Sequence, residues 1–211
     1  MSRHSLSSLF EPTSVAVVGA SSDAERIGGR VLRFLLESGY AGRIYPVNKS
    51  GLAEVQGLQA FASVSAIPGT LDQAIIVVPA GGVEAAVQDS IAKGVKCVLV
   101  LTSGFAEASP EGIALQAELV RVARSHGMRL LGPNCLGTVN VVDKLVGSFS
   151  IALEQNMPPA GHVGIVSQSG NIGSFTMSNM AQRGLGVSRF IATGNEADVD
   201  VADGIAALAQ D

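Results

Sequence analysis

The chain has 211 residues, 47% of them hydrophobic, with 14 Lys and Arg against 18 Asp and Glu. This hydrophobic content can form a core, which excludes a disordered chain. The formal net charge of −4 argues against nucleic acid as the main partner, because phosphate binding needs a basic face. Two cysteines cannot form a disulfide framework or a four-ligand zinc site. No apolar run approaches the roughly 18 residues of a membrane helix, and the polar N-terminus lacks a signal-peptide core, so we expect a cytoplasmic protein without a membrane partner.

Short apolar runs alternate with stretches of helical periodicity over the first part of the chain. Strands are predicted at 15–19, 43–47, 74–78, 96–101 and 128–131. Helices are predicted at 27–38, 83–93 and 111–125, the first two closed by Gly39 and Gly94, whereas 50–68 has only a weak pattern. Strands that alternate with such helices form right-handed βαβ units. We therefore predict an α/β fold with a Rossmann-like parallel sheet of five or more strands.

The alternation stops at 139–159, which contains Pro158-Pro159 and is predicted to be an excursion and linker. A second α/β unit follows, with strands at 162–167 and 187–193 and helices at 171–183 and 201–210. We divide the chain into a domain at 1–140, a linker at 141–160 and a partial domain at 161–211. Two strands and two helices cannot bury a sheet alone. This unit therefore either packs on the first domain or continues past Asp211, and we favour continuation.

Ligands of parallel α/β sheets bind outside the carboxyl ends of the strands. In this sequence the ends carry small, polar or turn-forming residues. They are Gly19, Asn48, Lys49, Pro79, Ala80, Thr102, Ser103, Gly104, Pro133, Asn134 and Cys135. This set is the candidate binding site.

The turn Gly19-Ala20-Ser21-Ser22 joins the first strand to a helix and can offer free N–H groups and a helix dipole to a phosphate. It departs from the Gly-x-Gly-x-x-Gly fingerprint of dinucleotide sites, with Ser21 and Ala24 at the second and third glycine positions. Lys49 stands where NAD sites carry an acidic residue, which favours a ligand with an extra ribose phosphate, either NADP or coenzyme A. The alternatives are a turn without a ligand and a solvated lysine.

A second anion site is predicted at Ser167, Gln168, Ser169, Gly170 and Asn171, where hydroxyls and a glycine open a helix. The segment is not a P-loop, since Gly-Lys-Ser/Thr is missing, and not a nucleophile elbow, since Gly-x-Ser-x-Gly is missing. The alternative is an N-cap cluster at a tight turn.

No catalytic residue and no metal ligand set is predicted. His4, His126 and His162 lack partners at metal or triad spacing and are interpreted as structural. Cys97 is predicted to lie in the core. Cys135 lies in the candidate cleft, but nothing in the sequence supplies the base that a thiol nucleophile requires.

Six segments occur in one order along nearly the whole chain. They are 17–21 (VVGAS), 45–49 (YPVNK), 77–80 (VVPA), 102–105 (TSGF), 132–137 (GPNCLG) and 164–170 (GIVSQSG). Together they resemble the N-terminal part of NDP-forming acyl-CoA synthetases, the superfamily of the succinyl-CoA synthetase α subunit and of ADP-forming acetyl-CoA synthetases. The Gly-Pro-Asn-Cys and Ser-Gln-Ser-Gly segments in this order are the most specific part of the resemblance.

The resemblance implies a CoA-binding Rossmann-like domain followed by the start of a flavodoxin-like domain. It implies that Gly19, Ala20, Ser21 and Ser22 hold the CoA phosphates and that Lys49 lies near the ribose phosphate. It further implies that the nucleotide is lined by Val78, Pro79 and Ala80, and the pantetheine by Thr102, Ser103, Gly104, Asn134 and Cys135. Ser167, Ser169 and Gly170 would match the helix start that holds the phosphate of a phosphohistidine.

In such enzymes an organic acid and CoA are joined through an acyl phosphate and a phosphohistidine, and an ATP-grasp part binds ATP with Mg. The implied partners are CoA, an organic acid, and an ATP-grasp domain or β-type subunit, and a homo-oligomer is also open. No histidine of this chain can be assigned the phosphohistidine role, so we expect CoA binding without the full ligation. Two alternatives are a regulatory synthetase-like region of a lysine acetyltransferase and an NADP-dependent oxidoreductase.

Overall fold

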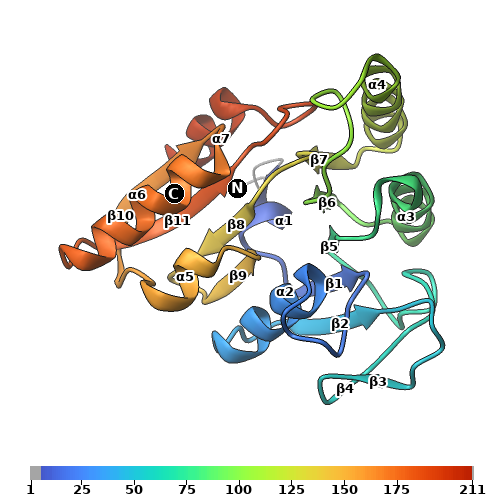
Figure 1. Ribbon diagram of the computed structural model, residues 1–211, viewed down its shortest axis with the longest axis horizontal. Coiled ribbons are helices and arrows are strands. Elements are labelled where there is room, and N and C mark those ends of the chain that lie inside the picture. The colour runs from blue at the N-terminus through green and yellow to red at the C-terminus, as the bar shows by residue number, and fades with distance from the viewer. Residues whose placement is uncertain (1–5, 211) are drawn as a thin grey trace.

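The computed structural model describes residues 6–210, which form two main β-sheets flanked by helices (Figure 1). The first sheet has five parallel strands in the order β2-β1-β5-β6-β7. They are β1 (Ser14–Val18), β2 (Arg43–Val47), β5 (Gln73–Ile76), β6 (Cys97–Val100) and β7 (Arg129–Leu131). The predicted parallel α/β sheet is confirmed, and every strand end lies within two residues of its predicted position.

Both faces of this sheet are buried, which explains why its strands are continuous apolar runs. In β1, Val15 and Val17 face the layer of α1 (Ser7–Phe10) and α2 (Ile27–Glu37). Ala16 and Val18 face the opposite layer, which α3 (Ala80–Lys93) and α4 (Pro110–Ser125) form. Successive side chains of a strand point to opposite faces, so one short run contributes to two cores.

Local signals define the helix ends. α3 ends at Gly94, whose φ of +78° is the left-handed conformation that glycine adopts most easily. α4 begins after Ser109, whose side chain accepts the N–H of Gly112 at 3.1 Å. α3 begins at Ala80, three residues before its predicted start. Only Val77, Val78 and Pro79 therefore separate the end of β5 from the N-terminus of α3.

The weakly patterned region after β2 contains a two-stranded hairpin of β3 (Glu54–Val55) and β4 (Leu58–Gln59). Gln56 and Gly57 at its tip have φ values of +50° and +82°, the signature of a tight hairpin turn. The Gln56 Nε2 group donates to the carbonyls of Ser21 and Gly29, each at 2.9 Å. The hairpin therefore fastens the turn between β1 and α2.

The second sheet has the order β10-β11-β8-β9. Its strands are β8 (Gly137–Asn140), β9 (Leu145–Ser148), β10 (Ala160–Ser167) and β11 (Val187–Ala192). β10 and β11 are parallel, whereas β8 is antiparallel to both β11 and β9. One face carries α5 (Ile151–Gln155) and α6 (Gly170–Gln182), and α7 (Val201–Leu208) packs on the other.

The segment 139–159, predicted to be an excursion and linker, forms strands and a helix over most of its length. β8 and β9 form a hairpin that adds two strands to the second sheet, and α5 follows them. The hairpin is stable here because β8 pairs with β11, about fifty residues further along the chain. The domain boundaries at 140 and 160 stay a prediction.

The second unit packs on the first. Residues 195–199 run beside β7, and the N–H groups of Asn195, Ala197 and Val199 donate to carbonyls in or just after that strand. The Asp198 side chain, 0% exposed, binds Arg124 at 2.6 Å and Arg129 at 2.9 Å. This segment covers the edge of the first sheet, which would otherwise present unpaired backbone groups.

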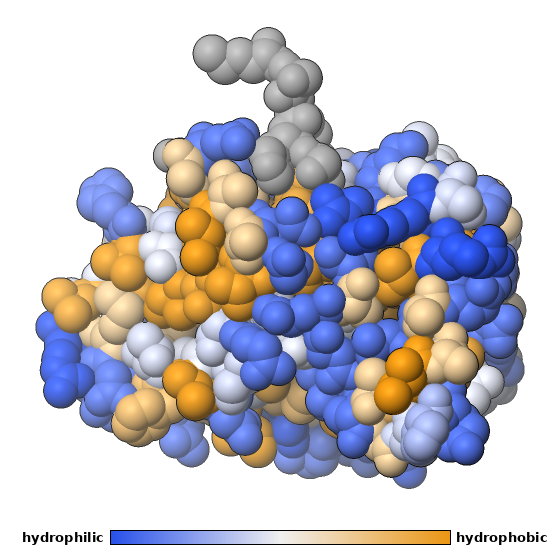
Figure 2. Space-filling model, turned by 90° about the horizontal axis from the view of Figure 1, so that it is seen from above, coloured by the Kyte–Doolittle hydropathy of each residue, from blue (hydrophilic) through white to orange (hydrophobic). Residues whose placement is uncertain are grey.

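β10 is an edge strand of the second sheet. Unlike β7, it has no further chain segment paired with its outer side among the described residues. Figure 2 shows the face seen from above, where an apolar area lies on the side of the second sheet and hydrophilic residues dominate the side of α4. Val163 of β10 is 43% exposed and Ile205 of α7 is 57% exposed. Within residues 6–210, no helix is long and apolar enough to cross a membrane.

Candidate functional site

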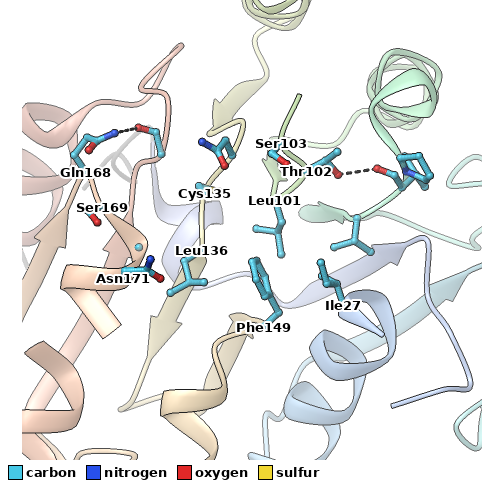
Figure 3. Close-up of a pocket in the computed structure, with 16 residues that line it drawn as sticks. Ile27, Leu101, Thr102, Ser103, Cys135, Leu136, Phe149, Gln168, Ser169 and Asn171 are labelled. Carbon is cyan, nitrogen blue, oxygen red and sulfur yellow. Dashed lines mark hydrogen bonds between the residues drawn. The ribbon is translucent and has the colours of Figure 1, made fainter. Parts of the chain in front are cut away.

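A cavity of about 610 Å³ lies at the carboxyl ends of the parallel strands, between the two sheets (Figure 3). Residues that follow β5, β6, β7, β9, β10 and β11, together with Ile27 of α2, form its walls. They are Ile27, Val77, Val78, Pro79, Leu101, Thr102, Ser103, Asn134, Cys135, Leu136, Phe149, Gln168, Ser169, Gly170, Asn171 and Gly194. None of these side chains carries a charge, and the lining combines neutral polar groups with apolar ones.

The first wall comes from the strands of the first sheet. Thr102 follows β6 and its hydroxyl donates to the carbonyl of Val78 at 2.7 Å, which joins the ends of β5 and β6. Pro79 is the N-cap of α3 and provides no side-chain cap, so the N–H groups of the first turn of α3 lack the usual side-chain acceptor. The dipole of α3 therefore presents its positive end beside Val78 and Pro79.

The loop after β7 forms the middle of the cavity and is tightly folded. The Gly132–Pro133 peptide bond is cis, and Asn134 has a φ of +55°. The N–H of Asn134 donates to the Thr102 carbonyl at 2.9 Å, which holds this loop against the end of β6. A Cβ atom on Gly194 would lie 2.5 Å from the Pro133 carbonyl oxygen, so only glycine allows the segment after β11 to approach so closely.

The second wall is the turn between β10 and α6. Ser169 is the N-cap of α6, and its hydroxyl accepts the N–H of Ile172 at 3.4 Å. The Gln168 side chain donates to the Gly194 carbonyl at 2.7 Å. A Cβ atom on Gly170 would lie 2.7 Å from the Leu136 side chain, so the start of α6 packs directly against the loop after β7.

Figure 3 shows that polar and apolar side chains lie in different parts of the cavity. The polar side chains at the start of α6 lie on one side and that of Thr102 lies on the other. Leu136 and Phe149 lie between them. Such a cavity suits an elongated ligand with a polar or anionic end and a less polar stretch.

Ten of the predicted site residues line this single cavity. They are Val78, Pro79, Thr102, Ser103, Asn134, Cys135, Gln168, Ser169, Gly170 and Asn171. The two predicted sites, one on each unit, are thus adjacent in space. Their adjacency follows from the packing of the second sheet on the first.

Eight predicted residues lie outside the cavity lining. They are Gly19, Ala20, Ser21, Ser22, Lys49, Ala80, Gly104 and Ser167. Gly19 is nevertheless next to a lining residue, since a Cβ atom on it would lie 3.1 Å from the Val78 side chain. Lys49 is exposed beyond the end of β2. The Ser167 hydroxyl donates to the carbonyl of Ser169 at 2.8 Å, within its own turn.

The prediction that the whole turn after β1 offers free N–H groups is wrong for two residues. The N–H groups of Gly19 and Ala20 both donate to the carbonyl of Val47, at 2.9 and 3.1 Å, because the pairing with β2 continues into the turn. Among the described residues, the N–H groups of Ser21 and Ser22 have no protein acceptor. Phosphate binding by this turn would therefore rest on Ser21 and Ser22.

Much of the apolar part of the lining was not predicted from the sequence. Phe149 follows β9, in the segment that was predicted to be a linker, and no local signal places it at the cavity. Leu136 belongs to the Gly-Pro-Asn-Cys-Leu-Gly segment, and Ile27 lies at a predicted helix start. The sequence therefore predicts the elements that carry them, but not that their side chains line the cavity.

The two cysteines are buried thiols. Burial raises the pKa of the Cys135 thiol to about 12, and its Sγ donates to the Val100 carbonyl at 3.5 Å. Burial likewise raises the pKa of Cys97 to about 12, helped by the nearby negative charge of Asp198. Because the thiolate is the reactive form, neither geometry nor ionisation supports a nucleophilic cysteine at neutral pH.

The two histidines that the structure describes, His126 and His162, do not line the cavity. His126 caps the end of α4 and its Nδ1 atom lies 3.0 Å from the Val122 carbonyl oxygen. His162 is exposed on β10, and His4 lies outside the described residues. Over residues 6–210, no group of three or more His, Cys, Asp or Glu side chains is placed to hold a metal ion.

Comparison with known proteins identifies both parts of the chain. Residues 13–140 match the CoA binding domain family, and residues 160–211 match the succinyl-CoA ligase like flavodoxin domain. The chain is 42% identical, over 94% of its length, to the alpha subunit of acetate–CoA ligase [ADP-forming] I from Pyrococcus furiosus. It is 41% identical, over 92% of its length, to the alpha subunit of the corresponding ligase II from the same organism.

A solved structure shares the whole fold. The dinucleotide forming acetyl-coenzyme A synthetase 1 from Ca. Korarchaeum cryptofilum superposes with a TM-score of 0.91 and 38% identity over 98% of this chain. The chain spans 43% of that protein, and 41% and 43% of the two Pyrococcus subunits. The resemblance to ADP-forming acyl-CoA synthetases is confirmed, and the chain belongs to the CoA binding domain family.

Proposed function

We propose that the cavity between the two sheets binds coenzyme A and that the chain is the CoA-binding part of an ADP-forming acyl-CoA synthetase. The observation that carries this proposal is the convergence of two sets of residues on one cavity. Residues expected to flank CoA come from the first sheet, and residues expected to hold a phosphate come from the start of α6. CoA would supply the thiol that accepts an acyl group.

The donor set of the site fits CoA. The turn after β1 offers the N–H groups of Ser21 and Ser22, and α3 and α6 direct two further helix N-termini toward the site. No acidic side chain among the described residues lines the cavity to repel phosphate. Leu136 and Phe149 provide an apolar surface for the pantetheine arm. The arrangement thus offers anion contacts at the ends and apolar contact between them.

We propose that the overall reaction joins an organic acid to CoA with conversion of ATP to ADP and phosphate. The Pyrococcus relatives are named as ADP-forming acetate–CoA ligases, and their alpha subunits carry the similar sequence. The start of α6, with Ser167, Ser169 and Gly170, would hold the phosphate of a phosphohistidine supplied from outside residues 6–210. ATP, Mg and the ATP-grasp chemistry would come from a further part or subunit.

Calorimetric titration with CoA, dephospho-CoA and NADPH tests the ligand. We expect CoA to bind more tightly than dephospho-CoA, and no heat with NADPH. Lys49→Ala should weaken CoA binding about fivefold, the equivalent of about 1 kcal/mol for an exposed charge contact, with little change for dephospho-CoA. The matched control is Lys96→Ala, since Lys96 is also exposed but precedes β6, at the opposite end of the sheet.

Two results would contradict this assignment. Equal losses for CoA and dephospho-CoA in Lys49→Ala would remove Lys49 from the ribose phosphate site. Binding of NADPH without CoA would favour the NADP-dependent oxidoreductase.

We further propose that the exposed edge of β10 pairs with another chain, either a β-type subunit with an ATP-grasp fold or a second copy of this one. Edge strands with exposed apolar residues such as Val163 invite pairing. In sedimentation equilibrium we expect an average mass above the 21.5 kDa of one chain, and Val163→Asp should return it to that value. A monomer at every concentration would leave only the β-type subunit as the partner of this edge.

A further inference from the structure

Asn195 lies where the two walls of the cavity meet. It directly follows Gly194, a lining residue, and its N–H donates to the Pro133 carbonyl at 3.0 Å. Its side-chain Oδ1 accepts from Nδ2 of Asn134, another lining residue, at 3.2 Å. The residue therefore touches the loop after β7 through both its backbone and its side chain.

The Nδ2 group of Asn195 reaches the opposite side of the same junction. It donates to Oε1 of Gln116 on α4 at 2.9 Å and to Oε2 of Glu107, in the loop between β6 and α4. Both hydrogens of the amide and its oxygen are thus engaged. A side chain without this combination of donors and acceptor cannot make the same contacts.

Glu107 completes the connection. Its Oε1 accepts the N–H groups of Gly104 at 2.5 Å and Phe105 at 3.2 Å, which follow directly after the lining residues Thr102 and Ser103. Partial burial acts to raise the pKa of Glu107. The hydrogen bonds from Asn195 and from these N–H groups outweigh it and hold the pKa below its usual value. Glu107 is therefore ionised at neutral pH and binds both loops as a carboxylate.

We propose that Asn195 and Glu107 are positioning residues that hold the two walls of the cavity in the arrangement that binds CoA. This inference rests on the proposed CoA function. Neither side chain lines the cavity, so both act through Gly194, Asn134 and the loop that contains Thr102. Without the hydrogen bond between Asn195 and Glu107, these loops would become ordered only when CoA binds. The conformational entropy lost in that ordering would weaken the binding of CoA.

The test is a double-mutant cycle on the 211-residue chain, with calorimetric titration of CoA and dephospho-CoA. Asn195→Asp places a second carboxylate against Glu107, and Glu107→Gln turns an amide donor toward the amide of Asn195. We expect each single variant to weaken both ligands about tenfold. The double variant E107Q/N195D restores a donor opposite an acceptor, so its affinity should return to within about threefold of the unsubstituted chain.

Controls separate positioning from stability and from charge. Asn179→Asp adds the same charge on α6, where Asn179 does not line the cavity, and should leave both affinities unchanged. Urea unfolding should give similar midpoints for all variants, because Glu107 is an exposed residue and Asn195 is only partly buried. If Asn195→Asp does not fold, the comparison of Glu107→Gln with the double variant still measures the rescue.

The outcomes distinguish this inference from the function on which it rests. A chain without substitutions that does not bind CoA would overturn the proposed function, before any variant is considered. CoA binding that is unchanged in both single variants would overturn only the positioning role. Losses that simply add in the double variant would do the same, because they would show that the two side chains act independently.

Discussion

Asp198→Asn is expected to destabilise the folded chain by about 3 kcal/mol, within the range for removing one partner of a buried ion pair. The Asp198 side chain is 0% exposed and binds both Arg124 and Arg129. It also accepts the N–H of Leu130 at 2.8 Å, so one carboxylate joins α4 and β7 to the segment that precedes α7. The estimate lies at the lower end of that range because the Arg124 side chain is 58% exposed.

Urea unfolding measures this loss as a lower midpoint. The control is Glu118→Gln, which breaks the pair between Arg121 and Glu118, with side chains 65% and 48% exposed. We expect little change there, because exposed pairs contribute little. Equal midpoints for Asp198→Asn and the unsubstituted chain would show that the ion pairs of Asp198 contribute nothing to holding the second unit on the first.

Gly28→Ala is expected to destabilise the chain by about 3 kcal/mol, the upper part of the usual range for overpacking. A Cβ atom on Gly28 would lie 2.1 Å from the carbonyl oxygen of Gly19 and 3.1 Å from the Val77 side chain. The obstacle is backbone, so α2 would have to move away from the turn after β1. Since Ser21 and Ser22 belong to that turn, any folded variant should also bind CoA more weakly.

Gly81→Ala is the matched control for this substitution. Gly81 also lies in the first turn of a helix, α3, and a Cβ atom there meets nothing within 4 Å. Its stability should stay the same or rise by up to about 1 kcal/mol, because alanine favours the helix. Thermal unfolding of the two variants side by side gives the comparison. Equal melting temperatures would mean that α2 can shift without cost.

Local patterns in the sequence are enough to predict the first sheet and most of the residues around the cavity. Buried parallel strands appear in the sequence as continuous apolar runs, and a glycine marks the end of a helix. These local patterns predict the ends of β1, β5 and β6 to within two residues of their observed positions. The carboxyl ends of the strands then follow from topology, which is why Thr102 and Asn134 could be selected as site residues. These features depend on backbone periodicity and on turn chemistry, both of which act over a few residues.

The pairing of groups that are distant in the sequence depends on how the whole chain packs. β8 joins β11 across the segment that resembled a linker, and this pairing brings Phe149 to the cavity. The N–H groups of Gly19 and Ala20 donate to the last residue of β2, so the free donors of that turn are the N–H groups of Ser21 and Ser22. Asn195 and Glu107 are 88 positions apart, yet they share a hydrogen bond. The sequence around a polar side chain looks the same whether that side chain faces water or a hydrogen-bond partner. Its partner can therefore be identified only from the packed structure.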